Sequence, residues 1–239
     1  MTGTVHHFPM RVSATLFAAV SIVAAGCSST SNAASPVPAP TLVPRPVVER
    51  DLDGMLLTPG EVTLLMGAQM TVTAAGDSHA ENTMADNSAI MSPPECLAVD
   101  GAAEAVVYAT SGFRAVRDQS FTDGDAFRHY VKQSVVLFPY RAPAEAFYAA
   151  SVQQWPACHS YTHTQSGSQW TVDEIADTDQ VLHTVATQQE AAAPGWACGR
   201  ALALRNNVIV DVNTCSAAPG DSAVRIATEI GAKVLRQRG

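Results

Sequence analysis

Basic residues, and charged residues in general, are scarce in this chain. Only 15% of its 239 residues are charged, and 14 lysines and arginines face 22 acidic residues, which gives a net charge of −8. A nucleic-acid-binding protein needs a dense basic surface, so this composition argues against one. Disorder is excluded as well, because 47% of the residues are hydrophobic. The length suits one or two domains with a sizeable core.

The signature motifs of common enzymes are also missing. The sequence has no G-x-S-x-G elbow, no H-E-x-x-H motif, no phosphate-binding loop, no kinase set and no CxxC pair. His159 and His163 have the spacing of a helical metal pair, but their Ser/Thr/Tyr-rich context predicts a strand, which would hold them about 13 Å apart. We therefore predict no catalytic residue, no metal site and no cofactor.

Two other groups of residues are candidates for a binding site, yet each has a simpler explanation. Trp155, Trp170 and Trp196 suit a sugar pocket, but a tryptophan near a disulfide cysteine is more often a core residue. Asp123-Gly124-Asp125 suits a cation site, but this pattern is typical of a turn. The sequence leaves the ligand-binding residues unknown.

The N-terminus carries the longest apolar stretch. Arg11 is followed by fourteen apolar or small residues, Val12 to Ala25, and then by Gly26-Cys27. A basic start, a short apolar region and small residues before a cleavage site predict a signal peptide over residues 1–26. A transmembrane helix is the alternative, but fourteen residues rise only about 21 Å, which is too short for a hydrocarbon core of about 30 Å.

Cys27 makes this prediction more specific. Ala24-Ala25-Gly26-Cys27 resembles the bacterial lipobox, in which the cysteine is diacylated and becomes the mature N-terminus, although Ala24 stands where leucine is usual. We expect Cys27 to carry fatty acyl chains such as palmitate, and two chains suffice for stable membrane attachment. The expected location is the outer face of the cell membrane. Plain secretion is the alternative.

A linker follows the predicted anchor. Residues 28–50 are first small and polar and then contain five prolines, a composition that favours an extended chain without a packed core. We assign residues 27–50 to the lipidated cysteine and its tether, and residues 51–239 to the folded body.

Helical and strand patterns are interspersed in the body, which indicates an α+β fold. Thr58-Pro59-Gly60-Glu61 predicts a capped helix that ends at Gly67. A second helix is expected from Pro143 to Pro156, and a third from about Asp221. Strands are expected over residues 104–121, 129–138, 160–190 (with a turn at 176–180), 197–205 and 208–215, and a loop is expected over residues 74–94.

Four cysteines remain after Cys27, and outside the membrane an even number predicts two disulfides among three possible pairings. Asn206-Asn207 suits a two-residue hairpin turn that pairs Arg205 with Val208. Counting back from this turn places Cys198 opposite Cys215 at a non-hydrogen-bonded site, where the Cα atoms approach to about 4.5 Å. The second pair, Cys96–Cys158, follows by elimination.

Three segments carry a resemblance to a known family. These are Gln133-x-Val135-Val136-x-Phe138-Pro139, Trp155-Pro156-Ala157-Cys158 and Gly195-Trp196-Ala197-Cys198. Together with the cysteines and the predicted anchor, they resemble the PknH-type extracellular sensor domain, which forms the outer part of certain mycobacterial receptor kinases and also occurs in lipoproteins. The resemblance implies a central antiparallel sheet with flanking helices, two intradomain disulfides and a cleft for an unknown ligand.

We therefore expect a lipid-anchored, non-enzymatic binding domain for an unknown small-molecule or envelope ligand, with a protein partner as a further possibility. A protein-interaction or assembly lipoprotein is the first alternative, and an envelope hydrolase is the second. A binding domain needs a pre-formed cleft, an assembly protein an exposed patch, and a hydrolase a nucleophile beside a base.

Overall fold

The computed structural model describes residues 45–73 and 84–236. The predicted signal peptide, Cys27, most of the tether and residues 74–83 of the expected loop lie outside these ranges. The helices are α1 Pro59–Met66, α2 Leu97–Asp100, α3 Ala105–Tyr108, α4 Arg141–Gln154 and α5 Ser222–Arg236. Short 3₁₀ helices are η1 Glu49–Asp51, η2 Ser88–Ile90, η3 Pro94–Cys96, η4 Gly124–Ala126 and η5 Trp155–Ala157.

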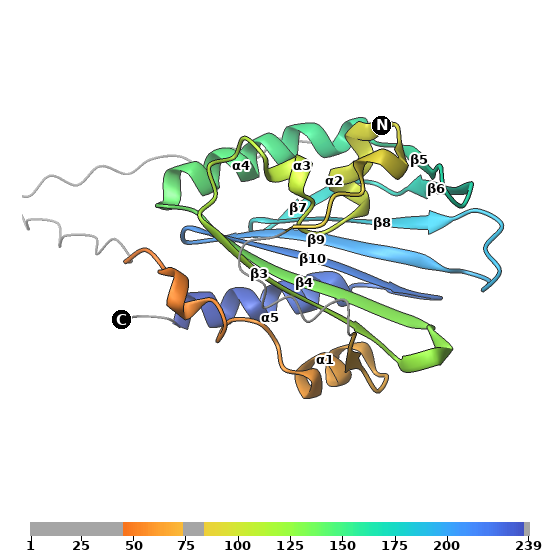
Figure 1. Ribbon diagram of the computed structural model, residues 1–239, viewed down its shortest axis with the longest axis horizontal. Coiled ribbons are helices and arrows are strands. Elements are labelled where there is room, and N and C mark those ends of the chain that lie inside the picture. The colour runs from red at the N-terminus through yellow and green to blue at the C-terminus, as the bar shows by residue number, and fades with distance from the viewer. Residues whose placement is uncertain (1–44, 74–83, 237–239) are drawn as a thin grey trace, which may run out of the picture. The chain divides into compact units, whose positions relative to one another are not determined.

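One sheet runs through the molecule, with helices on both faces (Figure 1). Its strands are β1 Thr71–Val72, β2 Met91–Ser92, β3 Ala115–Thr122, β4 His129–Leu137, β5 Ser160–His163, β6 Ser168–Val172, β7 Ala176–Thr178, β8 Val181–Gln188, β9 Ala197–Arg205 and β10 Val208–Ser216. The order is β1-β3-β4-β10-β9-β8-β6-β5-β2, with β7 paired to β8, and neighbouring strands are antiparallel. The expected α+β fold with a central antiparallel sheet is confirmed.

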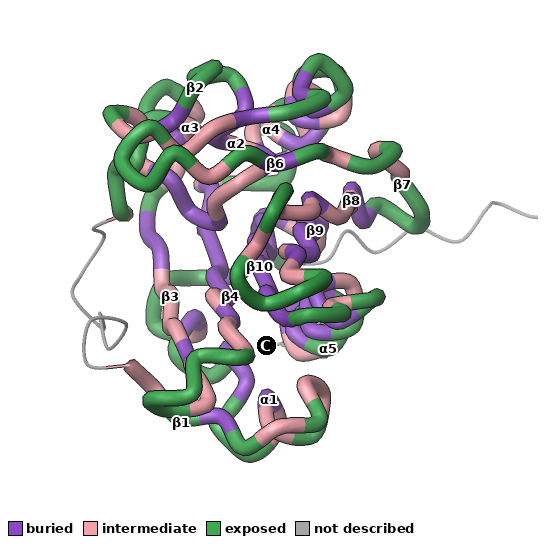
Figure 2. Tube along the Cα trace, turned by 90° about the vertical axis from the view of Figure 1, so that its right-hand side faces the viewer, coloured by how far each residue is buried: buried purple, intermediate pink, exposed green. Residues whose placement is uncertain are grey.

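The sheet separates two hydrophobic cores, because successive side chains of a strand point to opposite faces. Helices α1 and α5 cover one face, and α2, α3 and α4 cover the other (Figure 1). The predicted apolar stripe of α5 lies in the first core, where Ala223, Ala227, Ile230 and Val234 are at most 2% exposed. Strands β9 and β10 are buried along most of their length, whereas the outer loops are exposed (Figure 2).

The β9–β10 hairpin has the expected register. Arg205 pairs with Val208 and Cys198 with Cys215, and the latter two form a disulfide with a Cα–Cα distance of 4.1 Å. The second disulfide, Cys96–Cys158, is also present. Both predicted pairings are therefore confirmed.

Residues 45–50, within the expected tether, lie against the body. Val47 is 6% exposed, and its backbone N–H donates to Oδ1 of Asn207 at 2.7 Å. Asn207 Nδ2 in turn donates to the carbonyl oxygens of Val47 and Phe138. The second residue of the hairpin turn thus holds the incoming chain.

Several predicted boundaries were wrong. Residues 105–108 form helix α3 in place of the expected strand, because Tyr108 turns inward to bond with the sheet, and such contacts override a β-forming sequence. Helix α4 begins at Arg141, two residues before Pro143. In the expected turn at 176–180, the first three residues form β7, and only Asp179 and Gln180 turn, both with positive φ. The expected loop contains η2 and β2.

A buried ion pair lies at the centre of the sheet. Arg200 on β9 and Asp211 on β10 are 3% and 1% exposed, and Arg200 Nη1 contacts Asp211 Oδ1. Arg200 also donates to the carbonyl of Gly101 at 2.8 Å and lies 5.1 Å from the centre of the Trp155 ring. A cation on the sheet is therefore bonded to the segment that follows α2.

The carboxylate of this pair fixes the same segment. Asp211 Oδ2 accepts hydrogen bonds from the backbone of Ala103 at 2.9 Å and from the hydroxyl of Tyr108 at 2.8 Å. Ala103 has a φ of 51°, a left-handed conformation that costs about 1–3 kcal/mol and persists only where its surroundings require it. Burial and the nearby Asp211 raise the pKa of Tyr108, so its hydroxyl stays protonated and donates.

We expect Asp211→Ala to lower the free energy of unfolding by about 3–5 kcal/mol, because it leaves a buried cation without its partner. The matched control is Asp177→Ala. Asp177 also accepts a tyrosine hydroxyl, that of Tyr148 at 2.7 Å, but is exposed, so we expect a loss of about 1 kcal/mol or less. Urea denaturation measures both values. Equal losses in the two variants would contradict a dominant role for the ion pair.

Candidate functional site: a cleft beside a disulfide

A cleft of about 610 Å³ lies on the face of the sheet that carries α2, α3 and α4. Side chains from separate parts of the chain meet there. Strands β3 and β4 contribute Asp118, Ser120, Tyr130 and Lys132; β5 and β6 contribute His163 and Trp170; β9 and β10 contribute Cys198, Asn213 and Cys215; the remaining lining residues are Met84, Ala85, Asn87, Asp100, Gly101, Ala102, Glu104, Phe127 and Trp196.

Asp100, Gly101, Ala102 and Glu104 line this cleft, and they belong to the segment that the buried ion pair holds. Asn213 on β10 adds a further bond, since its Nδ2 donates to the carbonyl of Asp100 at 2.8 Å. Gly101 is required by close packing, because a Cβ atom there would lie 2.6 Å from Glu104 Oε1. The sheet thus determines where the acidic groups of this segment lie.

Two ion pairs lie in the lining of the cleft. Lys132 Nζ lies 3.4 Å from Asp118 Oδ2, and His163 Nε2 lies 3.0 Å from Asp100 Oδ1. All four side chains are between 11% and 25% exposed. The hydrogen bond that His163 donates to the carboxylate of Asp100 raises the pKa of His163. The cleft therefore contains charges that partly neutralise one another.

Glu104 is a third carboxylate in the lining and is only 3% exposed. Burial raises its pKa, although Asn87 donates to it from both its backbone at 2.9 Å and its side-chain amide at 2.7 Å. The bonds from Asn87 hold another part of the lining, Met84, Ala85 and Asn87, against the segment after α2.

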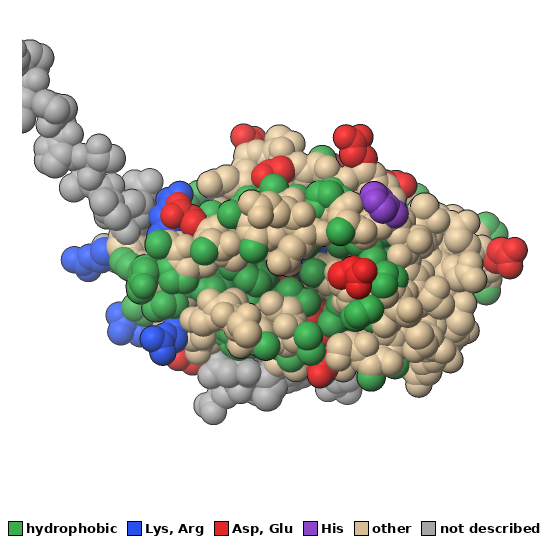
Figure 3. All heavy atoms as spheres, turned by 90° about the horizontal axis from the view of Figure 1, so that it is seen from above, with side chains coloured by type: hydrophobic (Ala, Val, Ile, Leu, Met, Phe, Trp, Pro, Cys, Tyr) green, Lys and Arg blue, Asp and Glu red, His purple; other side chains and the backbone are tan. Residues whose placement is uncertain are grey.

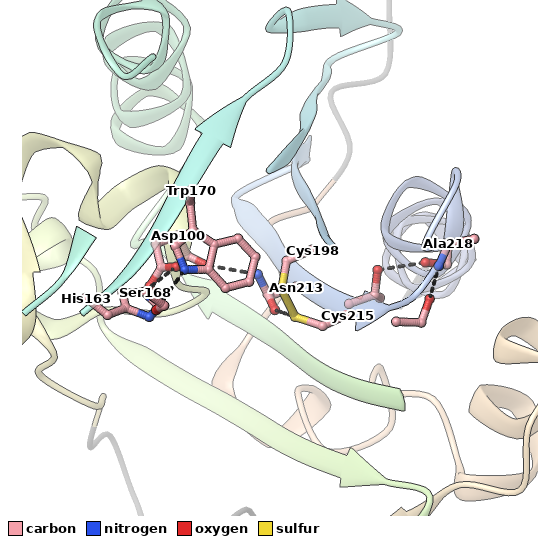
Figure 4. The surroundings of a disulfide bond; sticks show 11 residues. Asp100, His163, Ser168, Trp170, Cys198, Asn213, Cys215 and Ala218 are labelled. Atoms are coloured by element: carbon pink, nitrogen blue, oxygen red, sulfur yellow. Dashed lines mark hydrogen bonds and ion pairs between the residues drawn. A yellow bond between two sulfur atoms is a disulfide. The ribbon is translucent and has the colours of Figure 1, made fainter. Parts of the chain in front are cut away.

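Aromatic rings supply much of the apolar lining. Trp170 is 5% exposed, stacks on Tyr161 with ring centres 5.8 Å apart, and donates from Nε1 to Ser168 Oγ (Figure 4). Phe127 is 56% exposed and stacks on Trp196 at 6.1 Å. These rings give a ligand flat apolar surfaces to contact.

The disulfide Cys198–Cys215 belongs to this lining. In Figure 4 the bond lies beside Asn213, with the ring of Trp170 on the side toward Asp100 and His163. We predicted a structural disulfide at this position, but its place in a cleft depends on contacts with segments far away in the sequence.

The candidate site residues predicted from the sequence lie in different environments. Trp155 is a core residue at 2% exposure, whereas Trp170 and Trp196 line the cleft. His159 is exposed, and His163 pairs with Asp100. Among the described residues, no group of three or more His, Cys, Asp or Glu side chains is placed to hold a metal ion.

Asp123 behaves as a turn residue. It accepts the backbone N–H groups of Arg128 and His129 at 2.8 and 3.2 Å, and Gly124 takes a positive φ of 76°. The turn interpretation of this acidic pair is therefore confirmed. It also orients Phe127, whose φ is 44°, at the edge of the cleft.

The sequence analysis missed most of the cleft residues. A signal existed for Tyr130 and Lys132, because they alternate with the core residues Val131 and Gln133 and so must lie on the other face of β4. No comparable signal existed for Asp100 and Glu104, which only tertiary contacts bring there.

The fold is that of an extracellular sensor-type domain. The sequence profile of the PknH-like extracellular domain family matches residues 47–233, so the chain belongs to this family. The resemblance stated from the sequence is confirmed.

Known relatives agree with this assignment. The chain is 31% identical over 205 residues to serine/threonine-protein kinase PknH of Mycobacterium bovis and of Mycobacterium tuberculosis, an alignment that covers 84% of this chain. The chain spans about a third of the length of these kinases, 33% and 32% respectively. It is also similar to the crystal structure of the extracellular domain of PknH from Mycobacterium tuberculosis, with a TM-score of 0.72, 31% identity, and coverage of 81% of this chain and 99% of that one.

This family is extracellular, which supports a location on the outer face of the membrane. Within the part of the chain that the structure describes, no helix has the length and apolar character needed to cross a bilayer.

We expect the His163–Asp100 pair to make stability depend on pH. A histidine whose pKa is raised by folding stabilises the native state below its unfolded pKa, and this contribution is lost as the pH rises through the folded pKa. His163→Gln should therefore destabilise the protein more at about pH 5.5 than at about pH 8.5. Urea denaturation at the two pH values measures this difference.

The matched control is His159→Gln, which changes an exposed histidine four residues earlier. We expect a similar, small effect of this substitution at both pH values. A pH-independent loss for His163→Gln would show that the ion pair with Asp100 does not contribute through the charge on the imidazole.

Proposed function

We propose that this chain is a lipid-anchored, extracytoplasmic binding domain that captures a small ligand in the cleft without transforming it. The observation that carries the proposal is the cleft, because its volume of about 610 Å³ falls within the range of small-molecule sites, about 300–1,000 Å³. Aromatic surfaces with a few converging polar groups are the usual lining of such a site.

The charges in the lining favour a neutral or cationic ligand. Three carboxylates, on Asp100, Glu104 and Asp118, face the two basic side chains Lys132 and His163. An anion would meet excess negative charge, whereas a neutral polar molecule can use the hydrogen-bonding groups and stack on Trp170 or Phe127. On the face shown in Figure 3, acidic side chains are scattered and basic ones gather at one end.

The arrangement of polar groups supports binding over hydrolysis. Ser168 is the cross-strand neighbour of His163, which already bonds with Asp100, so these three residues invite comparison with a catalytic triad. Yet the hydroxyl of Ser168 bonds with Ser166 Oγ at 2.9 Å and with Trp170 Nε1 at 3.2 Å. These contacts direct it toward its own hairpin and give it no base.

The anchor is part of the proposal. A signal peptide over residues 1–26, a diacylated Cys27 and a proline-containing tether would place the cleft away from the membrane surface, on the periplasmic or cell-wall side. The extracellular character of the family supports this location.

We expect Cys27→Ala to abolish lipid attachment. The unmodified protein should partition into the detergent phase of Triton X-114 and show the mass of two acyl chains on its N-terminal peptide, because two chains hold a protein at the membrane. The variant should lose both properties, and the control Ser28→Ala should keep them. Retention of the lipid mass in Cys27→Ala would reject this residue as the anchor.

Ligand binding is tested by a thermal-shift series on the oxidised protein with envelope lipids, glycans and small metabolites. A ligand at 100 times its dissociation constant adds about 2.7 kcal/mol to the stability of the native state, which raises the melting temperature measurably. We expect a saturable rise that Ser120→Trp, which fills the cleft, abolishes.

The matched control is Leu64→Trp, which adds the same ring to a side chain that is 81% exposed on α1. A shift that survives Ser120→Trp would place the ligand outside the cleft. No shift across the panel would favour a protein-interaction lipoprotein instead, to be sought by cross-linking in whole cells.

A further inference from the structure

The two disulfides have different surroundings. Cys96 and Cys158 are 0% and 3% exposed and lie in the hydrophobic core on the α4 side of the sheet. Cys198 is half-buried, Cys215 is 7% exposed, and both line the cleft. A small molecule in the cleft would therefore meet the sulfur atoms of one disulfide and not of the other.

This difference matters for thiol–disulfide exchange, in which a thiolate attacks a disulfide sulfur and the other sulfur leaves. The rate depends on whether the attacking thiol can reach the sulfur. The cleft has room for a thiol of a few heavy atoms, and Cys198, the more exposed partner, is the sulfur to be attacked.

The fold does not depend on this bond to keep the two strands together. Strands β9 and β10 pair over nine residues, and each also pairs with a further strand, β8 or β4. The two cysteines are opposite each other in the ladder, so they remain neighbours when the bond is broken. We therefore expect cleavage of this bond to be local and reversible.

We propose that Cys198–Cys215 is a thiol–disulfide exchange site that low-molecular-weight thiols reach through the cleft. The small molecule enters as the neutral thiol and gives its proton to water, and the resulting thiolate forms a bond to Sγ of Cys198. The Sγ–Sγ bond breaks, and Cys215 leaves as a thiolate that takes a proton from water. A second thiol then attacks the mixed disulfide, which yields the Cys198 thiol and an oxidised dimer of the small thiol. The disulfide gains two electrons and the two small thiols lose them.

This inference goes beyond the proposed function and does not rest on it, because it requires only an open cleft and no other ligand. It assigns a covalent modification, a mixed disulfide at Cys198, to a residue whose evident role is structural. A ligand in the cleft would also compete with the thiol, since it would shield the sulfur atoms.

The test uses the native, oxidised protein and 2-mercaptoethanol. Samples are quenched with N-ethylmaleimide at intervals and digested, and mass spectrometry follows each cysteine-containing peptide separately. We expect Cys198 and Cys215 to react at least about tenfold faster than Cys96 and Cys158, with the mixed disulfide on Cys198. Circular dichroism should stay native during this phase, and removal of the thiol in air should restore the bond.

The Cys96–Cys158 pair is the internal control, and variants locate the route. Ser120→Trp should slow the reaction at Cys198, and Leu64→Trp should not. Equal rates at the two disulfides, or reaction at Cys198 only after the circular dichroism signal is lost, would overturn the proposal. An unchanged rate in a folded Ser120→Trp protein would overturn the cleft as the route, and if this variant does not fold, the ratio of rates in the unsubstituted protein still decides.

Discussion

The buried ion pair between Arg200 and Asp211 is the constraint on which the rest of the site depends. Two charges taken out of water carry a large desolvation cost, which their attraction offsets only if the remaining donors and acceptors are also satisfied. Arg200 donates to the carbonyls of Ala201 and Val212 within the sheet. The other partners come from outside the sheet: the carbonyl of Gly101 for Arg200, and the N–H of Ala103 with the hydroxyl of Tyr108 for Asp211. The hydrogen bonds with Gly101, Ala103 and Tyr108 therefore both stabilise the ion pair and fix the position of the lining segment.

The two faces of the sheet present different kinds of side chain, and Asp211 of the ion pair lies on the polar face. Under α5 the strands present mainly aliphatic side chains, such as Val208, Val210 and Val212, and the face is closed. On the other face the same strand, β10, presents Asp211, Asn213 and Cys215, which require polar partners or room. A strand that alternates in this way can support a hydrophobic core and a polar cleft at once.

Local patterns predicted those parts of the fold whose contacts are close in sequence. The turn at Asn206-Asn207 determined the register of its hairpin and hence one disulfide, and the capping box of Thr58 and Glu61 determined the start of α1. Sequence patterns did not predict helix α3 or the acidic lining, because the contacts that determine them join residues about 100 positions apart. Ala103 bonds with Asp211, and Arg200 bonds with Gly101. The hydrophobic periodicity of a segment does not indicate its contacts with residues far away in the sequence. Two lining residues, Trp170 and Trp196, were among the sequence candidates for a pocket, and the alternation along β4 carried a signal for Tyr130 and Lys132.

The position of the disulfide connects the two proposals thermodynamically. A ligand that contacts the cleft and a thiol that attacks Cys198 require the same space, so occupancy protects the bond and a mixed disulfide excludes the ligand. Such coupling is reciprocal: whatever factor the ligand imposes on the exchange equilibrium, the exchange imposes on ligand affinity. Asn213 lies between the disulfide and the carbonyl of Asp100, so it is the direct contact between the sulfur atoms and the segment that the ion pair holds. A sensor-type domain with this arrangement would read its ligand and its thiol environment at one site.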